Sequence, residues 1–142
     1  MSESESSRHI GRSIAALFAG FIVVVVLSIG TDSALHRLGI FPPSGEPMSN
    51  ELFALATAYR TVYAILGSYI TARFAPNRAM QHALLGGVVG LILSTVGAVA
   101  TWSRGPEFGP HWYPISLIIT ALPCAWVGGK LYLMQARRRT TA

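Results

Sequence analysis

The stretch SIAALFAGFIVVVVLSIG, residues 13–30, decides the fold class of this chain. It contains 18 residues and no charged side chain. A helix needs about 20 apolar residues to cross the hydrocarbon core of a bilayer. Three more apolar stretches follow, at residues 52–72, 83–102 and 114–133. They lack the period-two alternation of membrane strands. Because backbone groups in lipid must be satisfied within their own segment, the sequence predicts four transmembrane helices.

The expected architecture is an all-α, up-down-up-down bundle in a single domain, residues 11–136. The predicted spans lie near residues 13–38, 51–74, 80–102 and 113–135. Segments rich in proline and glycine separate them, at residues 41–50, 75–78 and 103–110. The polar residues 1–10 are expected to form a disordered tail, and residues 137–142 a basic tail.

The composition agrees with a membrane protein. The chain has 142 residues, of which 51% are hydrophobic and 12% charged, about half the charged share of an average soluble domain. Its net charge is +5, but the basic residues flank apolar stretches, so we expect contact with lipid and none with nucleic acid. A single cysteine, Cys124, excludes an intrachain disulfide and a cysteine-based metal site.

The distribution of Lys and Arg predicts the orientation. One side of the predicted bundle carries Arg8, Arg12, Arg73, Arg78, Lys130, Arg137, Arg138 and Arg139. The other carries only Arg37 and Arg104. The positive-inside rule therefore places both termini in the cytoplasm of a multi-pass protein of the cell (inner) membrane. An alternative remains open: the first apolar stretch could be a signal peptide cleaved after Gly30, since three spans with an outside N-terminus obey the same rule.

One charge lies inside a predicted span. Arg60 follows Glu51 by nine residues, which places it roughly 13 Å below the outer end of its helix at about 1.5 Å per residue. Such an arginine normally faces a partner in the protein interior. The partner we predict is Asp32, because the first helical pattern continues through TDSALHRL to about Leu38. The predicted intramembrane polar cluster consists of Asp32, His36, Arg60, Tyr59 and Tyr63.

The role of this cluster is open at this point. A paired Asp32 and Arg60 could fix the register of two helices. Arg60 could instead extend alone to the outer interface. A third interpretation is a site that binds or moves a solute, an anion or a proton.

Small residues form a stripe on the third predicted span. The predicted helix-packing seam consists of Gly86, Gly90, Ser94 and Gly97, and its GxxxG spacing allows two helix backbones to approach closely. Packing within the bundle is the simpler interpretation, and contact with a second copy or a partner helix is the alternative. In the fourth span Pro123 removes one backbone hydrogen bond, which predicts a helix kink.

Three stretches resemble a group of small, uncharacterised bacterial membrane proteins. They are TDSALHRLGIFPP (31–43), AYRTVYAILGSYITARFAP (58–76) and WYPISLIITALPCAWVGGKL (112–131). The resemblance implies four helices in a bacterial cytoplasmic membrane. It implies no activity, and it supplies no catalytic residues.

The functional expectation is correspondingly general. The chain has no GxSxG elbow, no HExxH motif and no second intramembrane acid beside Asp32. We therefore predict no catalytic residue, no metal site, no cofactor and no enzymatic activity. The prediction is an accessory, assembly or oligomeric membrane component, whose partners are the bilayer and either further copies or another membrane protein. The alternative is a small-solute, ion or proton transporter that acts as an oligomer through Asp32 and Arg60.

Overall fold

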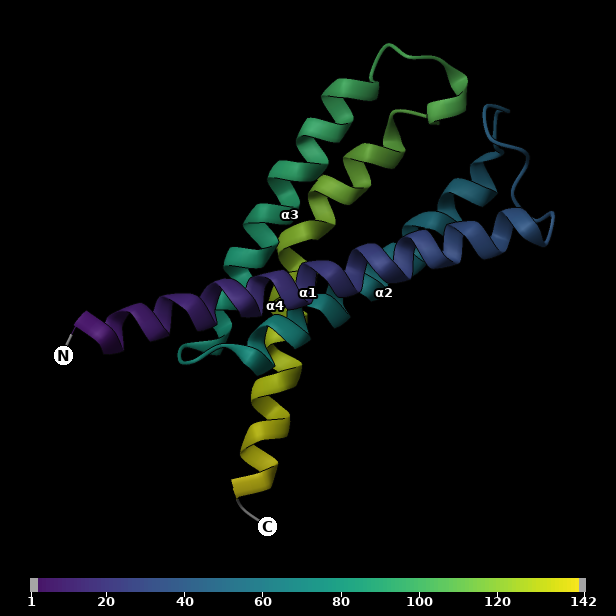
Figure 1. Ribbon diagram of the computed structural model, residues 1–142. Helices are drawn as coiled ribbons and strands as arrows, with labels where there is room; N and C mark the ends of the chain where they lie inside the picture. Colours follow the sequence, from purple (N-terminus) through teal and green to yellow (C-terminus); the bar gives the residue numbers. More distant parts are fainter. Residues whose placement is uncertain (1–2, 141–142) are drawn as a thin grey trace.

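Four long helices make up the fold, which a computed structural model describes for residues 3–140, with side chains from His9 onwards (Figure 1). The helices are α1 (Glu3–Arg37), α2 (Asn50–Phe74), α3 (Ala79–Thr101) and α4 (Trp112–Thr140). A short 3-10 helix, η1 (Pro106–Phe108), lies between α3 and α4. The prediction of an all-α, four-helix bundle is confirmed.

Both terminal helices extend into the predicted tails. Helix α1 is helical from Glu3, whereas its polar sequence predicts disorder up to residue 10. Adding turns to an existing helix is favourable, because the cost of nucleation has already been met. Helix α4 likewise continues to Thr140, into the predicted basic tail. Residues 1–2 and 141–142, which complete these tails, lie outside the described residues.

Three segments are long and apolar enough to cross a membrane, so the chain is a multi-pass membrane protein. They are His9–Arg37, Ala79–Thr101 and Pro106–Thr140. Helix α2 has 25 residues and is not one of them. Arg60 and the tyrosine, serine and threonine residues of α2 lower the mean hydropathy of this helix.

The interior is built from small side chains. Apart from Phe41 and Phe53, the buried apolar side chains of the described residues belong to alanines and Cys124. Bulky residues such as Phe18, Val62 and Val99 are more than half exposed. This distribution suits a membrane protein, in which close approach of small residues holds helices together and bulky residues face lipid.

Helix α2 is the central element, because it packs extensively against both α1 and α4 and also contacts α3. Figure 1 shows that α1 lies beside α2 and α3 beside the first half of α4. These two helix pairs cross and then diverge toward the ends that carry the α1–α2 and α3–α4 connections. Helices α1 and α3 contact each other only slightly.

Close helix contacts occur at glycines, but not at those of the predicted seam. A Cβ atom added to Gly87 would clash with Ala125 of α4, and one added to Gly20 would clash with Thr71 of α2. At Gly90 and Gly97 a Cβ would meet nothing within 4 Å, and at Gly86 only ordinary contacts. The prediction that the seam packs within the bundle is therefore wrong at Gly90 and Gly97. The face of α3 that packs against α4 contains Gly87. This residue follows Gly86 by one position, which is about 100° around the helix.

Helix α4 changes direction along its length. Its first half follows α3, and its second half turns toward the C-terminus (Figure 1). Pro123 lies inside this helix, as the kink prediction requires. Beyond it, Gly128 packs against the backbone of α2 at Ile65 and Tyr69, so the second half of α4 stays joined to the bundle.

Candidate functional site

Asp32 of α1 and Arg60 of α2 form an ion pair. Arg60 Nη2 lies 2.6 Å from Asp32 Oδ2, and the hydrogen bond between them is part-buried. The side chains of Arg60 and Asp32 are 33% and 31% exposed. The pair is therefore partly shielded, and its strength lies between that of a surface pair and that of a fully buried one.

The position at which α1 ends explains why Asp32 lies on a helix beside Arg60. Gly39 adopts a positive φ of 70°, which a residue without a Cβ tolerates. Its backbone N–H donates to the His36 carbonyl, and the N–H of Ile40 donates to that of Leu35. This pattern is the Schellman C-cap. Helix α1 therefore continues past Gly30 to Arg37, and Asp32 stands more than one turn inside its end.

Two tyrosines of α2 add hydrogen bonds to α1. The Tyr59 hydroxyl donates to Asp32 Oδ1, so both oxygens of this carboxylate accept a hydrogen bond. The Tyr63 hydroxyl bonds Thr31 Oγ1 instead, at 2.7 Å. The two tyrosine rings lie 5.7 Å apart between centroids. Three side-chain hydrogen bonds therefore join α1 to α2.

His36 takes no part in the ion pair. Its Nδ1 lies 2.8 Å from the backbone carbonyl oxygen of Asp32, one turn earlier on the same helix. Its ring lies 5.4 Å from that of Phe41, edge to face. The spacing of four residues correctly predicts a shared helix face, but the loop after α1 holds the imidazole away from the carboxylate.

Arg60 is not fully satisfied. Among the described side chains, its Nε is the one buried nitrogen or oxygen atom that has no hydrogen-bond partner. An unmade hydrogen bond of this kind costs about 1–3 kcal/mol. This cost offsets part of the stability that the ion pair between Arg60 and Asp32 supplies.

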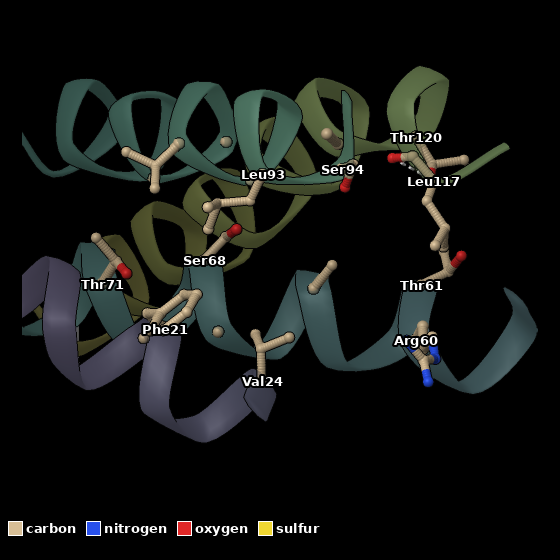
Figure 2. A pocket seen from close by; sticks show the side chains of 18 of the residues that line it. Phe21, Val24, Arg60, Thr61, Ser68, Thr71, Leu93, Ser94, Leu117 and Thr120 are labelled. Carbon is tan, nitrogen blue, oxygen red and sulfur yellow. Dashed lines mark hydrogen bonds between the residues drawn. The ribbon is translucent and has the colours of Figure 1, made fainter. Parts of the chain in front are cut away.

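A cavity of about 270 Å³ lies between all four helices, and Arg60 lines one end of it. Figure 2 shows the nitrogen atoms of Arg60 pointing away from Ser94, Leu117 and Thr120, which stand across the cavity. Gly86, Gly90 and Ser94 of the predicted seam also line this cavity. Their small side chains leave space instead of packing against another helix of the bundle.

Several contacts were missed by sequence reasoning. Thr31 lies beside Asp32 but belongs to no polar pattern that would single it out. The ring of Phe53, in the first turns of α2, lies 5.0 Å from that of Tyr113 in α4. His82 Nε2 of α3 lies 2.8 Å from Ser13 Oγ of α1. These pairs are far apart in the chain, and a single sequence carries no signal that connects them.

The hydrogen bond between Tyr63 and Thr31 gives a small, measurable prediction. We expect Tyr63→Phe and Thr31→Val to be coupled by about 0.6–1 kcal/mol, the usual value for a hydrogen bond between membrane helices. Unfolding of the purified protein in mixed micelles, for both single variants and the double variant, measures this coupling. Additive effects of the two substitutions would contradict the hydrogen bond.

No family model, no curated protein and no solved structure matches this chain.

Proposed function

We propose that this chain is a four-span, non-enzymatic membrane component, which works by associating with further copies or with another membrane protein. The observation that carries the proposal is where small and bulky side chains lie, which is the reverse of their arrangement in a water-soluble protein. Small residues fill the interior, and bulky apolar residues of α1, α3 and α4 are exposed along the length of these helices. Such surfaces suit contact with lipid and with other membrane helices.

The position of α2 supports its role as a fourth span. A helix that contacts the three others can carry polar side chains, because its neighbours shield them from lipid. Ala56, Gly67 and Thr71, which share the Arg60 side of the helix, are buried. Leu55, Val62 and Leu66 on the opposite side are exposed. Helix α2 is thus polar toward the protein and apolar toward the bilayer.

The Lys and Arg distribution supports an orientation with both termini in the cytoplasm. Arg73 and Arg78 flank the α2–α3 connection, whereas Arg37 and Arg104 flank the two opposite connections. The assignment to a bacterial inner membrane stays a prediction from the resemblance of the three sequence stretches.

Cysteine labelling tests the span of α2. In a Cys124→Ala background, we expect Ser44→Cys and Ser103→Cys to react with a membrane-impermeant maleimide added outside intact cells. Asn77→Cys, between α2 and α3, should react only after the membrane is opened. Because Ser44 and Asn77 lie at opposite ends of α2, labelling of both from the outside would show that α2 does not cross the membrane.

A transporter is the second candidate function, and one observation favours it: Arg60 lines the central cavity. Against it, Asp32 already binds the guanidinium, and Figure 2 shows the nitrogen atoms turned away from the far wall. Reconstituted vesicles distinguish the two functions. A component leaves proton and anion flux at the level of empty vesicles, whereas a transporter raises the flux and loses this activity in Arg60→Leu.

A further inference from the structure

One side chain joins the two ends of the α3–α4 connection. His111, which precedes α4, stacks on Trp102, which caps the C-terminus of α3. The two rings are 4° from parallel, and their centroids lie 4.2 Å apart. His111 Nε2 also lies 3.2 Å from the Trp102 carbonyl oxygen. Because a carbonyl oxygen can only accept a hydrogen bond, Nε2 carries a hydrogen and donates it.

Two glycines allow the connection to close in this way. Gly105 and Gly109 have positive φ values of 113° and 91°, which residues with a Cβ rarely adopt. They lie on either side of η1, and the chain reverses so that His111 returns to Trp102. The two rings therefore close a surface loop at its ends. We call the contact between His111 and Trp102 the loop clasp.

The stacked geometry of the loop clasp favours the protonated form of His111. Two neutral aromatic rings gain little from lying face to face, because their electron-rich faces oppose each other. A cation above an aromatic face is attracted to it, and the indole of tryptophan is the strongest such partner. The imidazolium form of His111 therefore binds the Trp102 ring more strongly than the neutral imidazole does.

The C-terminus of α3 favours the same form. The Trp102 carbonyl lies at this end of the helix, where the aligned peptide dipoles place partial negative charge. A hydrogen bond from a charged donor is also about twice as strong as one from a neutral donor. Since the Nε2–H is already in place, protonation of the other ring nitrogen strengthens this hydrogen bond without rotating the ring.

The charged residues of the elements that meet here do not oppose protonation. Within the connection, Arg104 and Glu107 carry opposite charges. The connection packs on the first turns of α2, where a Cβ at Gly109 would collide with the ring of Phe53. The charged residue in the first turn of α2 is Glu51. These elements together contribute two carboxylates and one guanidinium, which leaves the balance negative.

From these contacts we propose that the loop clasp is sensitive to pH. It holds the α3–α4 connection closed when His111 is protonated, and it opens when His111 is neutral. Opening also loosens the contact between Gly109 and Phe53, which joins the connection to α2. The inference goes beyond the proposed function and does not depend on the direction in which the chain crosses the membrane, so an unexpected topology in the cysteine labelling would leave it standing.

Acrylamide quenching of Trp102 fluorescence tests the proposal. In a background that carries Trp112→Phe and Trp126→Phe, Trp102 is the one remaining tryptophan. An imidazole ordinarily titrates near ~6.5, so measurements at about pH 5.5 and about pH 8 sample both forms of His111. We expect the ratio of closed to open clasp to be about two to five times higher at the lower pH. Quenching should be correspondingly weaker there, because the His111 ring covers one face of the indole.

Two substitutions of His111 hold the clasp in one state or the other. His111→Arg supplies a planar cation that stacks on the indole at every pH, so quenching should stay weak at both pH values. His111→Gln keeps an N–H donor but no charge, so quenching should stay strong at both. The matched control is His36→Gln. His36 lies at the end of α1 against the ring of Phe41, so its loss should leave the pH dependence of Trp102 unchanged.

Three results would overturn the proposal. The first is equal quenching at the two pH values when His111 is present. The second is a pH dependence that persists in His111→Gln or disappears in His36→Gln, since another group would then control Trp102. The third is quenching in His111→Arg as strong as in His111→Gln. Should the background without Trp112 and Trp126 fail to fold, incorporation of 5-fluorotryptophan into the otherwise unchanged chain gives Trp102 its own ¹⁹F resonance, whose pH dependence is compared in the same three variants.

Discussion

Gly128→Ala is expected to destabilise the protein by about 1–3 kcal/mol, the cost of inserting a methyl group into a closely packed interface. A Cβ at this position would collide with the Ile65 carbonyl oxygen, and would lie 2.7 Å from Ser68 Cβ and 2.8 Å from the Tyr69 backbone nitrogen. Two of these atoms belong to the backbone of α2, so no side-chain rotation relieves the clash. Helices α2 and α4 must move apart, and the contact between them on the C-terminal side of Pro123 is lost.

Gly97→Ala is the matched control for Gly128→Ala. Gly97 lies in α3, and a Cβ there meets nothing within 4 Å. Replacing a helical glycine by alanine without a clash stabilises a helix by roughly 0.5–1 kcal/mol. Thermal unfolding in detergent, followed by size-exclusion chromatography, should rank Gly97→Ala at or above the unchanged protein and Gly128→Ala well below it. Equal melting temperatures for the two variants would refute the close approach of α4 to α2.

Loss of either member of the ion pair is the second large effect. Removing one partner of a fully buried pair costs 3–5 kcal/mol. Since about one third of each side chain is exposed, we expect about 2 kcal/mol, or about 30-fold in the folding equilibrium. Asp32→Leu should be worse than Arg60→Leu, because an unpaired carboxylate can take up a proton and become neutral, whereas the guanidinium stays charged.

Arg37→Leu controls for the removal of an arginine as such. Arg37 is exposed in the last turn of α1, so its loss should change stability by no more than about 0.5 kcal/mol. Unfolding of the variants in increasing sodium dodecyl sulfate, at fixed total detergent, measures the differences. An effect of Arg37→Leu as large as that of Arg60→Leu would mean that the pair has no special role.

The helices could be predicted because they depend on local properties of the chain. The length of an uninterrupted apolar stretch identifies α1, α3 and α4, and proline and glycine separate the four helices. The depth of Asp32 could be predicted because the helical pattern of α1 passes Gly30 and ends near Gly39. Hence the pairing of Asp32 with Arg60 is accessible to sequence reasoning, although its function is not.

The contacts that could not be predicted depend on how helices rotate against each other. Gly86, Gly87 and Gly90 are identical in chemistry, and the sequence does not tell which of them faces α4. An error of one residue turns the helix by about 100°, which exchanges a glycine packed closely against α4 for one with room for a Cβ atom. His36 was misplaced for a similar reason, because the ring of Phe41 comes from a loop whose path no periodic pattern describes.

The central claim is that a direct charge pair joins α1 to α2, and exchange of the two charges tests it most directly. The protein that carries both Asp32→Arg and Arg60→Asp is compared with the two single substitutions in the detergent unfolding assay. Each single substitution places two like charges together, whereas the double substitution restores an opposite pair at the same two positions. We predict that the double variant is clearly more stable than either single variant. A double variant no more stable than the singles would contradict the claim.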